Sequence, residues 1–487
     1  MTIMQAQSAN DNMQSTAAEQ VALTAFARVV AERLGPNASF AEIESAGLRL
    51  GNELCRQHQQ EDLERRAARW TKETSEELVI DGTLYRYHAE GSEMIHSLCG
   101  SVRVVRATYR QVGVHNGPTV APLDLDAGLL SGATPALAFK LCEGYAQSPS
   151  RLLHKALLSS HREPPSRSAM ERIAKELGGE IRSAIVRLEP VVRAQESLPG
   201  GAFGLALGLD RTSAPMEELL DAEALLKYRN PRTKPYVRSA PDPIEVNYRM
   251  AYVGTVSVVD IDGRALMTRR YGASAEEGPN AITERMMADV TNALSERPGL
   301  SVVLVQDGAP EMWSLTRSAL SATLGPRDVR WCEAIDRHHV IERLSEVLVI
   351  AKEPPACRSA QIAEWNRCLD AEDEAIDEIE QHVIALRDGQ RGKARVALEE
   401  HVTYFCNNKH RMRYARLRAI GLPVGSGPTE GACKSLVMVR AKGCGQRWHV
   451  EGLDAVLTLR GLDMSERLAP VFDLFSREKV ASIRVAA

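Results

Sequence analysis

The chain has 487 residues, of which 44% are hydrophobic and 25% are charged, with a formal net charge of −4 at pH 7. This length exceeds what one simple core organises, so two to four domains are expected. A net charge near zero excludes a globally basic nucleic-acid binder, so any anionic partner must be met by local basic patches. No apolar run is long enough for a membrane span, and the N-terminus lacks a signal-peptide pattern.

The nine cysteines are scattered and contain no C-x-x-C pair. An odd number without regular spacing argues against a disulfide framework and against an obvious zinc site. We therefore expect a cytoplasmic protein whose thiols are reduced.

The N-terminal part changes its pattern twice. Residues 1–18 are polar and are expected to be disordered. Ser39 and Glu42 have capping-box spacing, which predicts a long helix within 19–75. Residues 77–110 then alternate and are rich in β-branched and aromatic side chains, which predicts strands.

Three short helices are predicted at 135–146, 149–159 and 166–177. Their tight connections and a basic third helix suit a helix-turn-helix that binds DNA, although many small helical domains have the same pattern. The candidate DNA-binding residues of the third helix are Arg167, Arg172 and Lys175.

The region from 202 to 336 predicts a mixed sheet. A short apolar strand is expected to end at Asp210, and a hairpin at 246–273 follows a basic, proline-rich linker at 227–243. Two helices then alternate with strands at 300–307 and 329–336. The order β-β-β-α-β-α-β with a buried strand after a crossover helix favours parallel pairing.

Residues 338–420 have only helical patterns. An acidic segment lies at 370–380, and a basic segment at 409–418 ends the region. The basic segment is either a solvated helix face or a surface that contacts phosphates. Its candidate DNA-binding residues are Lys409, Arg411, Arg413, Arg416 and Arg418.

A glycine-rich loop then leads into a helix that begins at Pro428, a residue suited to the first helical position. Glu430 lies in the first turn, where the helix dipole favours negative charge. Gly443 is expected to end this helix, and another is expected at 450–464. The residues expected near a site or DNA behind Glu430 are Lys434, Arg440, Lys442, Arg447 and Trp448.

Asp210 and Asp307 are expected to end two neighbouring parallel strands, where ligands bind in such sheets. Glu430 is the third carboxylate, brought by the next helix of the core. Three carboxylates suit Mg²⁺ or Mn²⁺, and two such ions support phosphodiester displacement. Each aspartate also has an ordinary explanation as a turn former. Asp260, in the hairpin turn, is the reserve candidate for the first acid.

This order of elements, with acids at those places, resembles the RNase H-like core of DDE transposases. The helical block before Glu430 resembles the α-inserted branch that includes Mutator-like and hAT elements. Asp336 and His339 match that branch's C/D-x-x-H motif. Five stretches look like bacterial insertion-sequence transposases of the ISKra group: LGLDRTSAPMEE, YRMAYVGTVSVVDIDGRAL, VVLVQDGAPEMW, AIDRHHVIERL and GLPVGSGPTEGACKSLVMVRAKGCGQRW.

The resemblance implies two-metal cleavage at the ends of a DNA element and transfer into target DNA. Asp210, Asp307 and Glu430 would be the metal ligands, with Asp336 and His339 near the metals or the DNA. It further implies terminal inverted repeats as substrate, a dimer or larger assembly, and association with the bacterial nucleoid when on DNA. Two other hypotheses remain: a domesticated relative that only binds DNA, and an RNase H-like nuclease.

The expected fold class is therefore an α/β core with a large all-α insertion and a mainly helical N-terminal DNA-binding region. The expected segments are 1–18 disordered, 19–75 helical, 76–130 small β region, 131–198 helical DNA-binding domain, 199–337 first part of the core, 338–420 helical insertion, 421–465 second part of the core, and 466–487 tail.

Overall fold

The computed structural model divides into two compact units. The first contains the chain up to Val192 together with the segment from Glu466 onward, and the second contains Arg193–Ser465. The disorder expected at the N-terminus and the linker expected at 227–243 fall outside the described residues, apart from 17–18. The described residues are 17–220, 244–307, 309–325, 327–443, 445–480 and 483–486.

Two helices open the first unit: α2 (Ala17–Leu34) and α3 (Phe40–Ala67). The predicted capping box is confirmed, since the Ser39 hydroxyl accepts from the Glu42 N–H. The Glu42 carboxylate in turn accepts from the Ser39 N–H at 2.8 Å. These two bonds satisfy donors that the first helical turn leaves open.

The strands predicted at 77–110 are confirmed and belong to an antiparallel sheet in the order β10-β1-β2-β3-β4. Side chains alternate between the two faces of this sheet, so Ile95 and Val102 are buried in one apolar cluster and Tyr109 is buried in another. The strands are β1 (Glu77–Ile80), β2 (Thr83–Ser97), β3 (Gly100–Gln111), β4 (Thr119–Val120) and β10 (Ile483–Val485).

The C-terminal segment differs from the expected weakly helical tail. It forms α19 (Leu468–Glu478) and then β10, which pairs antiparallel with β1. An apolar stripe drives this folding, because Phe472 and Phe475 are buried and Phe472 meets Phe139 edge to face. The last residues of the chain therefore complete a sheet that begins with residue 77.

The predicted helices at 135–146 and 149–159 are confirmed as α5 (Pro135–Gln147) and α6 (Ser150–Ser159), which follow α4 (Pro122–Ala127). The third is not short, because α7 runs from Arg167 to Arg193. Buried residues continue at helical spacing through Ile181 and Leu188. This packing outweighs the helix-weakening effect of the glycines that follow Leu177.

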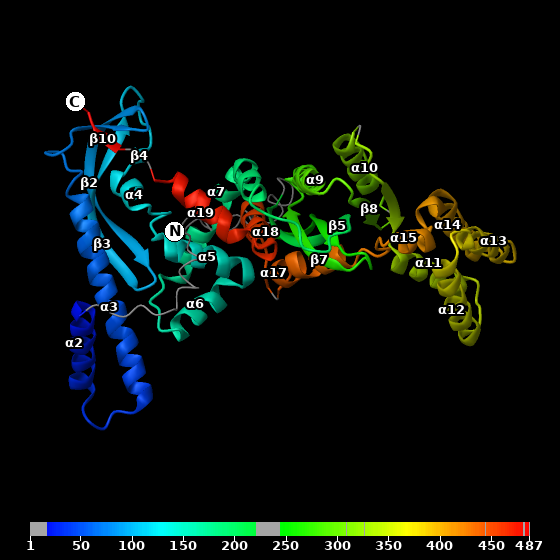
Figure 1. Cartoon of the computed structure of the whole chain (residues 1–487), viewed down its shortest axis with the longest axis horizontal. Coiled ribbons are helices and arrows are strands. Elements are labelled where there is room, and N and C mark those ends of the chain that lie inside the picture. The colour runs from blue at the N-terminus through cyan, green and yellow to red at the C-terminus, as the bar shows by residue number, and fades with distance from the viewer. Residues whose placement is uncertain are drawn as a thin grey trace, which may run out of the picture. The chain divides into compact units, whose positions relative to one another are not determined.

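The second unit contains a five-stranded mixed sheet in the order β7-β6-β5-β8-β9 (Figure 1). β8 is parallel to both β5 and β9, while β6 is antiparallel to β5 and β7. The predicted element order and hairpin are confirmed. The elements are β5 (Gly204–Leu219), β6 (Ile244–Val259), β7 (Ala265–Ala273), α9 (Gly278–Glu296), β8 (Ser301–Gln306), α10 (Pro310–Leu324) and β9 (Trp331–Ile335).

The first strand of this sheet is longer than expected. The sequence predicts that it ends at Asp210, whereas β5 continues to Leu219, paired throughout with β6. Its parallel partner β8 accompanies it only as far as Leu207. β7 accompanies β6 only as far as Tyr252, which pairs with Arg211, so beyond Arg211 the strands β5 and β6 form a two-stranded ribbon. On its other side β5 bonds to Trp448, through the carbonyl of Pro215 and the N–H of Glu217, so Pro215 needs no N–H of its own.

The all-helical region between the sheet and Glu430 is confirmed, and Figure 1 shows its helices gathered together beyond β8. Its core continues that of the sheet through residues such as Leu344, Trp365 and Phe405. The helices are α11 (Arg337–Ile350), α12 (Pro355–Ala371), α13 (Ala375–Asp388), α14 (Gly392–Asn408), a 3₁₀ turn (Lys409–Arg411) and α15 (Tyr414–Ala419).

The predicted single helix after the glycine-rich loop is interrupted. Glu430 lies on α16 (Gly427–Ala432), which continues as a π-helical segment (Cys433–Met438) and α17 (Val439–Ala441). The next helix, α18 (Val450–Met464), has the predicted bounds. In the described part of the chain, no helix is both long and apolar enough to cross a membrane.

Candidate functional site

Asp210 and Asp307 lie at the same level of the sheet. The last parallel pair between β5 and β8 joins Leu207 to Leu304, and each aspartate lies three residues further along its chain. Burial raises the pKa of the Asp210 carboxyl, and the nearby charge of Asp307 raises it further. The two carboxylates therefore interact directly, as expected for strands whose carboxyl ends meet at one edge.

Glu430 is brought to the same place by α16. Cys433, one turn further along that helix, lies with its sulfur 3.4 Å from Oδ2 of Asp210. Burial raises the pKa of the Cys433 thiol, and the charges of Asp210, Glu430 and Asp307 act in the same direction. The thiol thus contacts Asp210 and lies within the electrostatic influence of Glu430 and Asp307, so all three predicted acids lie in one neighbourhood.

His339 and Lys434 lie beside Glu430. Nε2 of His339 lies 3.7 Å from one Glu430 oxygen, and Nζ of Lys434 lies 4.0 Å from the other. Burial alone would lower the pKa of His339, but its hydrogen bond to Glu342 and the charges of Asp336, Glu342 and Glu430 raise it overall. The second half of the D-x-x-H motif therefore contacts the third acid.

The carboxylate of Asp336 accepts hydrogen bonds from neighbouring backbone and side-chain groups. It is buried, and as the N-cap of α11 it accepts hydrogen bonds from the N–H groups of His338 and His339. Its other oxygen accepts from the N–H of Ser426 and, at 2.6 Å, from the Ser426 hydroxyl. Burial alone would raise the pKa of Asp336, but these four hydrogen bonds lower it.

Ser426 connects Asp336 to the third acid, because its Oγ also lies 3.3 Å from Oε1 of Glu430. The D-x-x-H motif thus holds Glu430 from two sides, directly through His339 and indirectly through Asp336 and Ser426. Sequence reasoning missed Ser426 and Cys433. The only signal for Ser426 was its place just before a helix that begins Gly427-Pro428.

The helix that carries Glu430 is docked closely onto the sheet. Thr429 and Thr255 are both buried, and their hydroxyls are 2.7 Å apart. Gly208 of β5 lies directly beneath, and a Cβ atom built on it would be 2.1 Å from Oγ1 of Thr429 and 3.1 Å from the Val305 carbonyl oxygen. Only glycine permits this approach, two residues before Asp210.

Gly208→Ala is therefore expected to push α16 away from β5 and lower the free energy of unfolding by about 1–3 kcal/mol. Chemical denaturation measures the loss. Gly299→Ala is the control, because no atom lies within 4 Å of a Cβ there. Adding Thr429→Ala to Gly208→Ala is expected to recover part of the loss, and a double variant whose loss equals the sum of the two single losses would contradict this contact.

Asp260 is excluded from this cluster by its position. Asp210 pairs with Val253, and Asp260 lies seven residues further along β6, roughly 23 Å away at the usual rise per residue. Its carboxylate accepts from the N–H groups of Asp262 and Arg264. Turn formation accounts for Asp260, as the sequence suggested.

The basic residues behind Glu430 divide into two groups. Lys434 is 71% exposed, Lys442 donates to the Thr212 hydroxyl at 3.1 Å, and Arg447 pairs with Glu217 at 2.7 Å. Arg440, expected on the cationic face, is instead buried against the ring of Trp448. Trp448 is a core residue whose indole donates to the Ala441 carbonyl.

The basic segment at the end of the helical region pairs mainly with the acidic segment noted in the sequence. Lys409 and Arg413 both bind Asp377, at 3.2 and 2.7 Å. Arg418 binds Asp370 at 3.1 Å, and Arg416 is 3.8 Å from Asp373. Arg411 is almost buried between Glu333 and the ring of Trp313. Most of this segment therefore stabilises the helical region.

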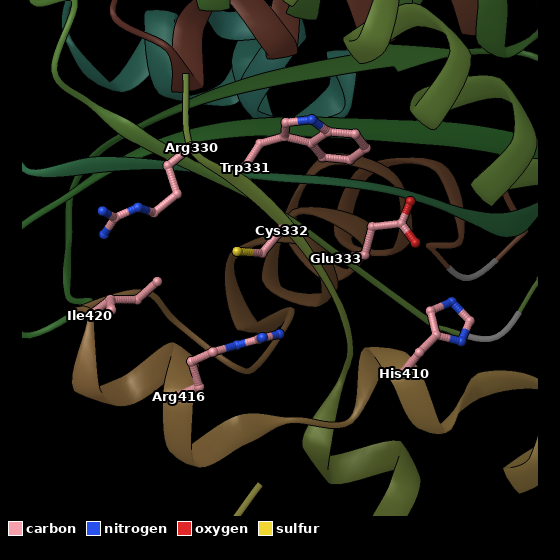
Figure 2. A pocket seen from close by; sticks show the side chains of 7 residues that line it. All are labelled: Arg330, Trp331, Cys332, Glu333, His410, Arg416 and Ile420. Atoms are coloured by element: carbon pink, nitrogen blue, oxygen red, sulfur yellow. The ribbon is translucent and has the colours of Figure 1, made fainter. Parts of the chain in front are cut away.

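Arg416 is the most exposed of these cations and lines a cavity of about 520 Å³ at the edge strand β9. Figure 2 shows Arg330, Trp331, Cys332 and Glu333 on its strand side, and Arg416, Ile420 and His410 on its helical side. In the first unit, the predicted basic residues of α7 are also exposed: Arg167, Arg172 and Lys175.

A second cavity, of about 390 Å³, adjoins the acids. Asp307 and His339 line one part of it, and Glu342, Arg343 and Tyr404 line another. The Arg343 guanidinium lies 3.9 Å from the centre of the Tyr404 ring. Nothing in the sequence distinguished these two residues, because α11 and α14 meet only in the folded chain.

The donors that converge are carboxylate oxygens, which are the ligands that Mg²⁺ and Mn²⁺ prefer. A partly buried Asp210 beside Asp307 is also an arrangement that a cation would stabilise. The residues therefore fit a hard divalent cation. Within the described ranges, no three His, Cys, Asp or Glu side chains are arranged as a metal-binding group.

The sequence was compared with protein-family models and with curated proteins. No family model matches the chain, and no curated protein matches it.

Proposed function

We propose that the chain is a DNA transposase with an RNase H-like catalytic core, which cleaves the ends of a DNA element and joins them to target DNA. The observation that carries the proposal is the convergence of Asp210, Asp307 and Glu430 around Cys433. The sheet order β7-β6-β5-β8-β9, with the acids where parallel strands end, supports it. So does the resemblance of the motifs to insertion-sequence transposases.

Asp210, Asp307 and Glu430 would hold two Mg²⁺ or Mn²⁺ ions. Bound there, such ions activate a water or a 3′-hydroxyl and stabilise the leaving oxygen of a phosphodiester. His339 neutralises part of the charge of Glu430 and orients it. Asp336 fixes the start of α16 through Ser426, so that Glu430 keeps its position when the charges around it change.

The substrate in this proposal is DNA with terminal inverted repeats, followed by target DNA, bound by a dimer or larger assembly. Lys434, which lies 4.0 Å from Glu430, and Lys442, which bonds to Thr212 two residues from Asp210, are suited to phosphate contacts. Arg416 and Arg418, and the exposed cations of α7, are further candidates. Each phosphate contact would make binding weaken with salt.

The test is to incubate the protein with DNA that ends in its terminal inverted repeats, with Mg²⁺ or with a chelator. Nicked or joined products that require the metal ion are expected. Binding without any metal-dependent nicking or joining would refute the proposal in favour of a relative that only binds DNA. Cutting of branched DNA without preference for repeat ends would favour a nuclease.

A further inference from the structure

The ribbon beyond the sheet has an apolar face that is exposed. Ile244, Val246, Tyr248 and Met250 alternate along β6, so they share one face, and Tyr248 is 68% exposed. Leu219 of β5 pairs with Ile244, is exposed and extends the patch, whereas Pro215, which pairs with Tyr248, is buried. A strand of a soluble fold usually turns such a face inward, so an exposed one marks a binding surface.

A cavity of about 580 Å³ adjoins this face. Pro215, Val246 and Tyr248 supply apolar parts of its lining, and Lys442, Gln446 and Arg447 supply polar parts. An exposed aromatic ring, two cations and an amide therefore line the same cavity. Arg447 also pairs with Glu217, whereas Lys442 bonds to the neutral hydroxyl of Thr212.

Lys442 connects this cavity to the three acids. Its Nζ lies 3.1 Å from Oγ1 of Thr212. Thr212 and Asp210 are two residues apart on β5 and point to the same face, roughly 7 Å from one another. Tyr248 pairs with Pro215 and lies on the other face of the ribbon, so Lys442, which bonds to Thr212 and also lines the cavity, stands at the β5 edge between the two faces. A polynucleotide whose phosphate reaches Asp210 would cross that edge at Lys442 and place its next bases beside the cavity.

We infer that this cavity binds an unpaired DNA strand next to the cleavage site, with a base stacked on Tyr248 and phosphates held by Lys442 and Arg447. The inference rests on the proposed function and adds that the DNA bound in this cavity is single-stranded. Base faces stack on aromatic rings only when they are unpaired, whereas a duplex offers only backbone and groove edges. The flanking cations favour a polyanion over an apolar protein partner.

The test uses the full-length protein, a chelator instead of Mg²⁺, and a single-stranded oligonucleotide that contains 2-aminopurine, whose fluorescence falls on stacking. Tyr248→Ala is expected to weaken binding roughly tenfold and to abolish the fluorescence change, while Tyr248→Phe keeps both. Binding of a blunt duplex of the same sequence is expected to stay unchanged. The matched control is Ile261→Ala, an exposed apolar residue at the other end of β6.

Equal affinity of wild type and Tyr248→Ala for the single strand, or an equal loss on the duplex, would overturn the inference. So would a change in sedimentation of Tyr248→Ala without DNA, because the patch would then join two copies of the chain. Cleavage plays no part in these measurements. A Tyr248-dependent single-strand affinity without metal-dependent cutting would therefore sustain this inference while refuting the transposase.

Discussion

Glu430→Gln is expected to lower metal-dependent strand cleavage by about a thousandfold while DNA affinity and thermal stability stay close to those of wild type. Glutamine has the shape of glutamate and can still contact Ser426 and His339. It lacks the negative charge that a divalent cation requires between Glu430, Asp210 and Asp307. The rate of nicking under single-turnover conditions measures the effect, since product release then has no influence.

The control for this variant is Glu451→Gln, because Glu451 is also a first-turn glutamate, on α18, and is exposed. It is expected to cleave at the wild-type rate. Cleavage by Glu430→Gln within tenfold of wild type would show that Glu430 is not a ligand. A large loss of DNA affinity in Glu430→Gln would instead assign the residue to substrate binding.

The sheet and its helices were predictable because their patterns are local. The uncharged β-branched run at 301–306 reflects burial on both faces of a sheet, and the alternation within 77–110 corresponds to the alternating burial along β3. The end of β5 was not predictable in this way. Polar residues and Pro215 follow Asp210, and they are compatible with a strand because β6 pairs with this stretch on one side and Trp448 bonds to it on the other without needing the Pro215 nitrogen.

Long-range pairing accounts for the other differences. Arg413 is basic and α13 is acidic, but nothing in a single sequence shows that Arg413 binds Asp377. A charged segment that pairs internally has the same composition as one that binds DNA. The folding of α19 and β10 onto the first unit likewise depends on β1, some four hundred residues earlier in the chain.

The three acids were predictable, but what holds them in place was not. Strand ends and a helix N-terminus identify carboxylates that topology can bring together. The contacts of Ser426, Thr429 and Cys433 depend on side chains that meet across the fold, and these residues have no periodic or spacing signal of their own. The motif resemblance places Asp336 near the metals or the DNA. In the structure its hydrogen bonds hold Ser426 and the first turn of α11 in position.

Asp336→Ala is expected to lower the free energy of unfolding by about 2–4 kcal/mol, since it removes a helix N-cap and two hydrogen bonds from buried Ser426 to a charged acceptor. The pKa of Asp336 is lowered in the folded chain, so its contribution is full above the unfolded pKa and is lost as pH falls through the folded one. The difference between wild type and variant should therefore be constant near neutral pH and shrink below about pH 4.

Denaturation at pH 7, 5 and 3.5 measures this difference, with Asp328→Ala as the control because Asp328 is exposed and lies just before β9. The control is expected to change stability by less than about 0.5 kcal/mol at every pH. An Asp336→Ala variant as stable as this control would mean that Ser426 and α16 keep their place without the carboxylate. Glu430 would then be held by His339 and by the packing of Thr429 on Gly208, and the D-x-x-H aspartate would need another explanation.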